Sequence, residues 1–322
     1  MFTLRFDMRA PVSGAPPSSL YPAALEMAEW AETRGLILLV VSEHHAAEDC
    51  FLPSPLLMAA ALAGRTKSVP IAVSALILPL YNPVRLAEDI GVLDHLSGGR
   101  ISYTVGIGYR PEEFESVGVD YHRRGELADA HLDVLLKALG GERFDHNGRG
   151  VLVRPAPEAK VRISYGGGTV QAARRAARFG LGFNAQNNLP ELAHAYYDEC
   201  SRHGRVPGRL QQPRPGFPTT VFVADDVDRA WEEIGPYLLH DAVSYADGHH
   251  DPNIVSLSTA KSIDELRAEN GSHRIYTVAQ AVEAIARDGN LSLHPLCGGM
   301  PPDVGWPYLR RVVDEVMPAV PR

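Results

Sequence analysis

Residues 36–41 read Leu-Ile-Leu-Leu-Val-Val, six apolar residues with no polar residue among them. A strand with one face in water alternates apolar and polar residues, whereas this run is typical of a strand that is buried on both faces. Strands of that kind occur in parallel sheets whose two faces are covered by helices. The run therefore favours an α/β fold built on a parallel sheet.

Strand and helix patterns alternate along the rest of the chain. Ser54 and Asn82 each precede a proline, and a capping residue followed by proline is a favoured start for a helix. The strands predicted are 4–8, 36–41, 71–78, 101–105, 161–165, 181–185, 219–224 and 291–296. The helices predicted are 21–34, 54–67, one that begins at 82–83, 123–139, 169–179, 189–203, one from 225 or 226 to about 240, 277–288 and 306–316. This order predicts a single (β/α)8 TIM barrel over residues 1–322.

Two segments interrupt the alternation. Residues 140–160 have the pattern of a polar hairpin, and residues 241–276 are rich in Asp, His, Asn and Ser with weak periodicity. A long insertion in a compact barrel is often a lid or a binding loop. We therefore expect an inserted loop region at about 241–276, before the last strand.

Composition narrows the classes of partner. The net charge of −8 argues against nucleic acid or an anionic membrane as a partner. No apolar stretch approaches the roughly 20 residues that a membrane-spanning helix needs. The three cysteines are widely spaced and odd in number, which favours a reducing cytoplasm without a disulfide framework.

Polar and glycine-rich residues follow several of the predicted strands. In a (β/α)8 barrel the reactive residues lie on the loops after the strands, so these segments are the candidate site. They are 42–45, 79–82, 106–110, 166–169 and 294–299.

The loop Gly166-Gly167-Gly168-Thr169 is the best candidate for binding an anion. Glycines let the backbone approach a ligand closely, and the free N–H groups at the start of the following helix attract phosphate. Arg123 and Arg124 could reach the same anion. A simple turn capped by Thr169, with the two arginines in solvent, explains the same residues.

Gly106-Ile107-Gly108 resembles part of a dinucleotide-binding fingerprint, but the third glycine is missing. We predict no helix at that point and find no acidic residue at the distance that would bind a ribose, so a Rossmann fold is rejected. The glycines instead fit a flat ring that lies against the backbone.

Ser42-Glu43-His44-His45 ends the apolar run. A carboxylate and two imidazoles beside an apolar interior are costly unless they are used or well paired. The histidines could ligate zinc or iron, or transfer protons beside a redox ring. A structural histidine bonded to a neighbour is the third explanation. We interpret His249-His250-Asp251 as a solvated loop.

Several blocks together resemble the bacterial-luciferase superfamily of flavin-dependent monooxygenases. The similarity is strongest over residues 36–125. It rests on Glu43-His44-His45, on 62–66, 78–79 and 83–89, on Leu93-Asp94-His95-Leu96-Ser97-Gly98-Gly99-Arg100, and on Phe114 with 118–120. It continues through the glycine loop, 176–180 and 316–318.

This resemblance implies a TIM barrel that binds reduced flavin at the carboxyl ends of its strands. His44 matches the catalytic histidine of the family, Ser74-Ala75 matches the site of a non-proline cis peptide bond under the flavin ring, and Thr169 matches a phosphate-binding serine. Residues 241–276 match a mobile loop that closes over the flavin. The cofactor-binding residues expected are Glu43, Ser74, Ala75, Gly106, Ile107, Gly108, Tyr109, Arg124, Gly166, Gly167, Gly168 and Thr169.

One position departs from the family. Luciferases carry an arginine after the fourth strand that binds the flavin phosphate, and this chain has Ile107 there. Arg123, Arg124 or the glycine loop must then meet the phosphate charge. Related reductases and dehydrogenases use the deazaflavin F420, and the glycine loop resembles theirs equally well.

We therefore expect a luciferase-like enzyme that uses reduced FMN and O2 to monooxygenate a small organic substrate, with a separate reductase supplying the cofactor. An F420-dependent oxidoreductase that transfers hydride without O2 is the alternative. We expect no metal cofactor and, from the family, a homodimer. A metal-dependent hydrolase that uses His44 and His45 and a flavoprotein without activity are hypotheses from other classes.

Overall fold

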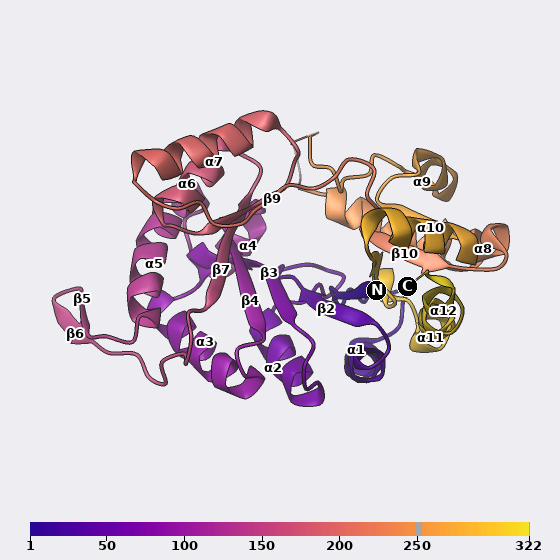
Figure 1. Cartoon of the computed structure of the whole chain (residues 1–322), viewed down its shortest axis with the longest axis horizontal. Helices are drawn as coiled ribbons and strands as arrows, with labels where there is room; N and C mark the ends of the chain where they lie inside the picture. Colours follow the sequence, from indigo (N-terminus) through magenta and orange to yellow (C-terminus); the bar gives the residue numbers. More distant parts are fainter. Residues whose placement is uncertain (249–250, 252, 322) are drawn as a thin grey trace. The chain divides into compact units, whose positions relative to one another are not determined.

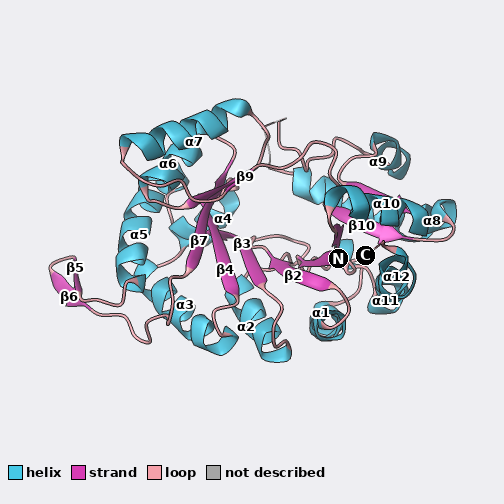
Figure 2. Cartoon of the chain, in the orientation of Figure 1, coloured by secondary structure: helices cyan, strands magenta, loops and turns pink. Residues whose placement is uncertain are grey.

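The computed structural model describes residues 1–248, 251 and 253–321 (Figure 1). The chain divides into two compact units. The first unit is Met1–Pro53, Ser68–Pro70 and Arg214–Arg322, and the second unit is Ser54–Lys67 and Ile71–Pro213. In each unit parallel strands are flanked by helices (Figure 2).

The first unit contains five parallel strands in the order β11-β10-β12-β1-β2. Their bounds are β1 Phe2–Phe6, β2 Leu36–Val41, β10 Thr220–Val223, β11 His273–Tyr276 and β12 Leu291–Leu293. The helices are α1 Pro17–Glu32, α8 Val227–Ala246, α9 Ile263–Glu269, α10 Val278–Asp288, α11 Pro302–Arg311 and α12 Met317–Ala319, with a 3-10 turn at Cys297–Gly299 and a π turn at Val312–Val316.

The second unit contains the strands β3, β4, β7, β8 and β9 in that order, all parallel. Their bounds are β3 Ile71–Ile77, β4 Ile101–Gly106, β7 Arg162–Gly167, β8 Gly182–Ala185 and β9 Leu210–Gln211. The helices are α2 Pro55–Arg65, α3 Pro83–Ser97, α4 Pro111–Ser116, α5 Arg124–Leu139, α6 Val170–Arg178 and α7 Pro190–Arg202, with 3-10 turns at Leu78–Leu80 and Tyr121–Arg123. An antiparallel hairpin, β5 Phe144–His146 and β6 Arg149–Val151, lies within the predicted hairpin segment.

The apolar run at 36–41 forms β2, and none of its six residues is exposed. β1 buries Phe2, Leu4 and Phe6 completely. The interpretation of the run as a strand buried on both faces is therefore confirmed. Polar residues that directly follow such a strand lie at the carboxyl edge of the sheet. In open parallel sheets this is the edge at which ligands bind.

The structure differs from the prediction within 241–276. α8 does not end near His240 but continues to Ala246, because Leu238 and Ala242 continue its buried face. The segment also contains α9, capped by Ser262, and β11. The strand was missed because His273, which occupies a buried position, reads as a loop residue in the sequence.

Three smaller differences follow from local chemistry. α1 begins at Pro17 after the cap Pro16, because proline is tolerated in the first turn of a helix. The short helix α4 begins three residues after Gly108, where no helix was predicted. β9, only two residues long, was also missed. His249 and His250 lie outside the described residues, so the interpretation of that segment stays a prediction.

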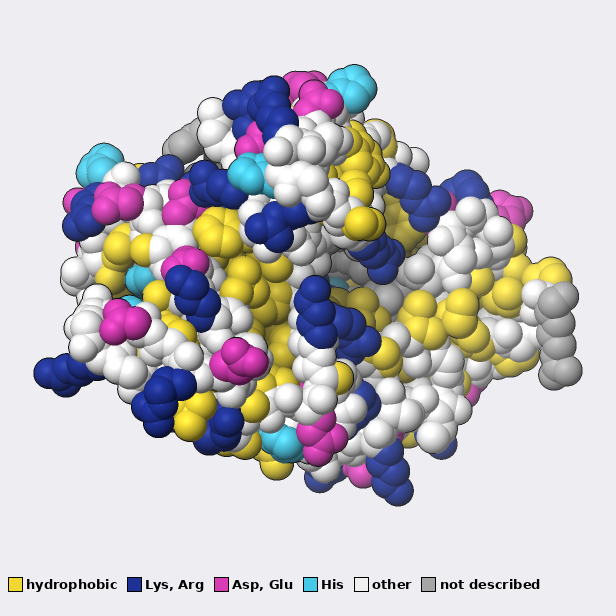
Figure 3. Space-filling view, turned by 60° about the vertical axis from the view of Figure 1, so that its left-hand side comes forward, with side chains coloured by type: hydrophobic (Ala, Val, Ile, Leu, Met, Phe, Trp, Pro, Cys, Tyr) yellow, Lys and Arg dark blue, Asp and Glu magenta, His cyan; other side chains and the backbone are white. Residues whose placement is uncertain are grey.

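No helix among the described residues is long and apolar enough to cross a membrane. On the face seen in Figure 3, Lys and Arg side chains are interspersed with Asp and Glu. That face therefore offers no continuous basic surface.

The two predicted helix caps allow a matched stability test. The Asn82 side chain accepts hydrogen bonds from the backbone N–H groups of Val84 and Arg85, at 3.0 and 3.1 Å. The Ser54 side chain makes no such bond within the described structure. We expect Asn82→Ala to lower the free energy of unfolding by about 1 kcal/mol, and Ser54→Ala to change it by much less. Urea unfolding of both variants checks this, and equal losses would contradict the assignment.

Candidate functional site at the carboxyl ends of the strands

His44 lies on the loop that follows β2, in the first unit. His44 is 9% exposed, and its backbone N–H donates to the Leu52 carbonyl at 3.2 Å. The Phe51 ring meets the imidazole edge-on, with 4.6 Å between ring centroids. The predicted catalytic histidine is therefore held by its own loop and keeps a narrow opening to solvent.

Glu43 and His45 form a pair beside it. The Glu43 side chain is completely buried, and its Oε1 lies 2.8 Å from His45 Nε2. A buried carboxylate needs such a partner. The pairing with His45 gives the buried Glu43 carboxylate a hydrogen-bond partner.

A cluster of buried charges lies behind this loop, also in the first unit. Arg5 Nη2 lies 3.1 Å from Asp241 Oδ1, and His273 Nε2 lies 2.9 Å from Asp241 Oδ2. Burial alone would raise the pKa of Asp241, but the charge of Arg5 and the hydrogen bond from His273 hold it well below its usual range. Burial would also raise the pKa of Asp7, which the neighbouring His294 and Arg5 lower. Both carboxylates are therefore fixed anions.

Asp49 connects the loop to this cluster. It is paired with Arg9 through Arg9 Nη1, and His240 Nε2 lies 2.9 Å from its Oδ2. Burial opposes the charge on Asp49, yet the bond from His240 and the charge of Arg9 outweigh burial and lower its pKa to about 2. Asp49 thus stays ionised over the whole pH range in which enzymes commonly work.

Asp241, His294 and Cys297 are buried, and within the described residues they form a group whose ligand atoms lie within 4.8 Å of one another. A cysteine binds a metal as its thiolate. Burial and the nearby carboxylates raise the pKa of the Cys297 thiol well above its usual value, which disfavours that form. Two guanidinium groups, those of Arg5 and Arg9, already face Asp241. The charges around this group therefore disfavour a cation.

In the second unit, small residues line the carboxyl ends of β3, β4 and β7. A Cβ atom placed on Gly106 would lie 3.8 Å from both the Ala75 side chain and the Gly166 carbonyl oxygen, so these three residues are neighbours. A Cβ on Gly166 would come within 3.0 Å of the Thr104 methyl group. Three of the predicted residues, Ala75, Gly106 and Gly166, thus contribute to one side-chain-poor surface, which we call the ledge.

The peptide bond between Ser74 and Ala75 is cis, as the resemblance implies. Gly108 has a second reason for being glycine besides the one predicted. Its φ is +72°, and a Cβ there would lie 2.7 Å from Ile77 and 2.9 Å from Phe114. The turn and the packing beneath it therefore require this glycine. Ile107 and Tyr109 are half-buried on the same loop, where the Tyr109 carbonyl accepts a hydrogen bond from Tyr121 Oη at 3.2 Å.

The glycine loop leads into the start of α6. Thr169 is the capping residue, and its Oγ1 accepts from the Ala172 N–H at 3.2 Å. A Cβ on Gly167 would lie only 2.7 Å from the Ala172 side chain, so the strand and the helix meet here without room for a side chain. Asn187 Nδ2 donates to the Gly168 carbonyl at 3.0 Å. The start of a helix is a position at which backbone N–H groups can hold an anion.

The two arginines at the start of α5 differ. Arg123 is exposed and pairs with Glu126 at 2.7 Å, which is the solvated alternative stated for it above. Arg124 is half-buried with its guanidinium 3.8 Å from the centre of the Tyr121 ring. Its Nε is buried and has no hydrogen-bond partner among the described residues. A buried donor of this kind suits an anionic ligand.

Several polar residues around the ledge escaped the prediction. Asn184 Nδ2 donates to Thr104 Oγ1 at 2.8 Å across the ends of β4 and β8. Arg175 joins the first turn of α5 to α6, by bonds to the Gly125 carbonyl and to Asp129. Thr104 and Asn184 fall inside or beside the predicted strands 101–105 and 181–185, and their position near a strand end was the available signal.

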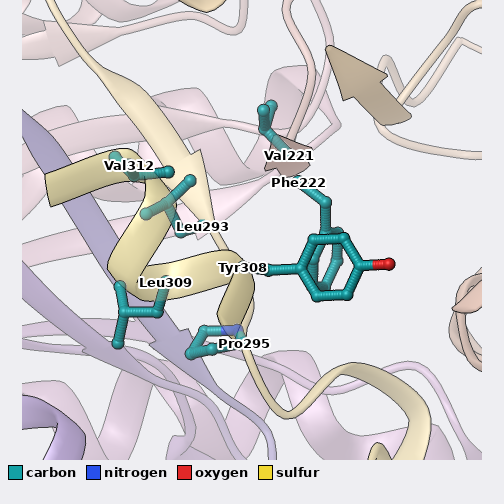
Figure 4. A pocket seen from close by; sticks show the side chains of 7 residues that line it. All are labelled: Val221, Phe222, Leu293, Pro295, Tyr308, Leu309 and Val312. Carbon is teal, nitrogen blue, oxygen red and sulfur yellow. The ribbon is translucent and has the colours of Figure 1, made fainter. Parts of the chain in front are cut away.

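The first unit contains an apolar pocket (Figure 4). It lies between β10, β12 and α11, and its lining is Val221, Phe222, Leu293, Pro295, Tyr308, Leu309 and Val312. The Tyr308 and Phe222 rings meet edge-on with centroids 5.6 Å apart. This pocket lies in the packing layer between strands and helix. Pro295 is the one lining residue that falls in a predicted site segment, 294–299, and none of the predicted catalytic or cofactor-binding residues lines the pocket.

The low pKa of Asp49 predicts an acid-dependent stability. The folded protein holds this proton less tightly than the unfolded chain, so the stabilisation is complete above the unfolded pKa of about 4 and is lost as the pH falls through about 2. The shift corresponds to about 2 kcal/mol. We expect Asp49→Asn to be less stable than wild type by that amount at pH 7, with the difference shrinking between pH 5 and pH 2.

Urea unfolding at a series of pH values measures this difference. Asp225→Asn is the matched control, because Asp225 is an exposed partner of Arg311 in the same unit. A difference for Asp49→Asn that does not vary with pH would contradict the prediction.

Comparisons with known proteins place these features in a family. The chain matches the family described as luciferase-like monooxygenase over residues 6–288. It is 27% identical to the 4-hydroxyprotoasukamycin monooxygenase of Streptomyces nodosus subsp. asukaensis over 65% of this chain and 61% of that protein. It is 28% identical to the oxygenase component of the flavin-dependent trigonelline monooxygenase of Acinetobacter baylyi, over 40% of this chain and 36% of that one. The chain spans less than two thirds of the length of these curated relatives.

Solved structures share the fold over nearly the whole chain. The monooxygenase RslO1 of Streptomyces bottropensis superposes with a TM-score of 0.75 at 20% identity, covering 99% of both chains. The oxygenating constituent of the Pseudomonas putida 3,6-diketocamphane monooxygenase, solved with FMN, gives 0.70 at 18% identity over 99% and 98%. An F420-dependent secondary alcohol dehydrogenase gives 0.65 at 16% over 94% and 97%. The predicted TIM-barrel class is thereby confirmed, and the chain belongs to the family of luciferase-like monooxygenases.

Proposed function

We propose that this protein binds reduced FMN and uses O2 to monooxygenate a small organic substrate. The observation that carries the proposal is the ledge in the second unit, where Ala75, Gly106 and Gly166 leave the strand ends bare of large side chains. A planar ring needs such a surface, and the start of α6 with its free N–H groups adjoins the glycine loop.

The residues of the second unit fit the phosphate end of the cofactor. The backbone of Gly167 and Gly168 and the hydroxyl of Thr169 would hold phosphate oxygens at the α6 terminus. Arg124 would supply the positive charge, since its buried Nε lacks a partner among the described residues. Together they replace the arginine that the family carries at the position of Ile107. When bound, reduced flavin supplies the electrons for the reaction with oxygen.

His44 is the proposed proton-transfer group. An imidazole can hold or release a proton near neutral pH. His44 is 9% exposed, so it is largely shielded from water but still accessible. Glu43, paired with His45, holds the neighbouring part of the loop. Residues 241–276 are proposed to contribute a loop that excludes water, because a closed pocket protects reactive species from hydrolysis.

A separate reductase is the proposed source of reduced cofactor. The trigonelline relative is named as an oxygenase component, which is the designation of one part of a two-component system. Cys50, Cys200 and Cys297 are free thiols, and this is consistent with a reducing cytoplasmic location. A homodimer remains our proposal for the assembly.

An F420-dependent hydride transfer is the second candidate. Ile107 favours it, because the position lacks the arginine that binds the FMN phosphate in luciferases. The F420-dependent dehydrogenase with the same fold is a precedent for the fold alone. Both cofactors would use the same ledge and glycine loop.

His44→Ala separates chemistry from binding. We expect turnover to fall by about 10²–10⁴, the usual contribution of general acid–base catalysis, while the dissociation constant of the cofactor stays nearly unchanged. Steady-state kinetics with a reductase supplying the cofactor and an anaerobic binding titration measure the two effects. Unchanged turnover would remove His44 from the reaction.

Gly168→Asp tests the anion site and identifies the cofactor. A carboxylate at the start of α6 would repel the cofactor's phosphate, so we expect at least tenfold weaker binding, equivalent to about 1.4 kcal/mol. Gly168→Ala is the control, because it adds a side chain without charge. Anaerobic titrations of both variants and wild type with reduced FMN and reduced F420 distinguish the candidates. Equal affinity of wild type and Gly168→Asp for both cofactors would reject the site.

A further inference from the structure

Arg9 is a buried cation that neither the proposed chemistry nor the family match assigns. It follows β1 and is 2% exposed. Its Nε lies 3.7 Å from Asp7 Oδ2 and 3.6 Å from Asp241 Oδ1, and its Nη1 pairs with Asp49. Burial opposes the charge, but these carboxylates outweigh it and raise the pKa of Arg9. Arg9 therefore remains charged and is held from three directions.

The guanidinium also reaches the aromatic ring that touches His44. Arg9 Cζ lies 4.4 Å from the centre of the Phe51 ring. The same ring meets the His44 imidazole edge-on at 4.6 Å, with an angle of 89° between the planes. Phe51 is 5% exposed, so it is packed between the two groups with little freedom. The Phe51 side chain thus contacts both the Arg9 guanidinium and the His44 imidazole.

Backbone hydrogen bonds join the same loop to the end of β1. The Ala10 N–H donates to the Asp49 carbonyl at 2.6 Å, and the Leu52 N–H donates to the Asp7 carbonyl at 2.8 Å. The His44 N–H in turn donates to the Leu52 carbonyl. The Asp49 to Leu52 part of the loop, which contains Phe51, is thus bonded to Asp7 and Ala10, close to Arg9 in the chain, and His44 is bonded to Leu52.

We propose that Arg9 is a positioning residue for His44, acting through Asp49 and Phe51. The proposal rests on the proposed function, in which His44 moves a proton. Arginine suits this role because its planar fork can pair with several carboxylates and stack on a ring at the same time. A catalytic group displaced by about 1 Å can lose roughly a hundredfold in rate, so a rigid support for the loop has a direct effect on turnover.

A purely structural role would predict a different pattern of kinetic effects. If the Arg9 pairs only stabilise the first unit, then weakening them lowers activity, if at all, to the same extent whether or not His44 is present. If Arg9 acts through His44, the loss appears only when His44 is there to be displaced. A double-mutant comparison with His44→Ala separates these cases.

The variants are Asp49→Asn, which removes the charge facing Arg9, Phe51→Leu, which removes the ring, and Arg9→Lys, which keeps the charge and loses the planar fork. Each is made in wild type and in His44→Ala. In the wild-type background we expect kcat/KM to fall roughly 10- to 100-fold, with the cofactor dissociation constant unchanged. In the His44→Ala background we expect no further loss. Arg311→Gln, which breaks the exposed pair with Asp225 in the same unit, should have no effect in either background.

A second measurement does not depend on turnover. In protein labelled with ¹⁵N-histidine, the His44 imidazole signals are assigned by their disappearance in His44→Ala. We expect them to shift or broaden in Asp49→Asn and Arg9→Lys, which leave the Phe51 ring in place, and to stay unchanged in Arg311→Gln. Unperturbed His44 signals in both variants would overturn the proposal, and so would equal kinetic losses in the two backgrounds. Full activity of His44→Ala would instead refute the proposed function, while shifted imidazole signals would still establish the positioning contact.

Discussion

The arrangement of the first unit depends on the neutralisation of buried carboxylates at the end of β1. Asp7 and Asp241 are almost completely buried, and an isolated charge at such a position would cost many kilocalories per mole. Arg5 and Arg9 make the burial possible, because each faces both carboxylates. The pairs connect β1 to α8, and the bond between His273 and Asp241 adds β11. A buried pair of this kind contributes little net stability compared with apolar packing. Removing one partner, however, would leave a buried charge without compensation, which is strongly destabilising.

In the second unit the strand ends are arranged by small residues and not by buried charge pairs. Small residues at 75, 106 and 166 bring neighbouring strands to an edge without side chains, and the Ala172 methyl occupies the space beside Gly167. Polar groups then surround the edge: Thr104 and Asn184 bond to each other, and Asn187 holds the Gly168 carbonyl. A site built in this way depends on backbone geometry, so a single added methyl group at Gly166 or Gly167 would displace its neighbours. Under the proposed function, the chemistry itself would belong to a bound cofactor, and the protein would supply position and electrostatics.

Local patterns in the sequence predicted the parallel strands, most helices and the cap at Asn82, because burial on both faces and capping leave clear periodic signals. The resemblance supplied what no local pattern contains, such as the cis bond between Ser74 and Ala75. Arg9 and Asp241 were not identified, because their partners lie up to more than two hundred residues away in the chain, and pairing at that distance has no periodicity. β11 was missed for the same reason: His273 is acceptable in a buried strand only because Asp241 receives its hydrogen bond. The assignment of the glycine at 108 to ligand contact stays a prediction, and its positive φ and the packing of Phe114 are a second requirement for glycine there.

Under the proposed function, the presence of Ile107 where luciferases carry an arginine affects how the anion would be held. An arginine on a loop would bring its charge to the phosphate on a flexible side chain, whereas Arg124 stands at the start of α5 with its guanidinium already stacked on Tyr121. Arg175 ties that turn to α6 by a bond to the Gly125 carbonyl, so the cation and the helix terminus of Thr169 are connected through the second unit itself. Less side-chain entropy is then lost when an anion binds. A site whose cation is held in a fixed position would favour cofactors whose phosphate lies at a matching position relative to the ring. FMN and F420 differ in their phosphate-bearing tails, so they would place different demands on the same residues.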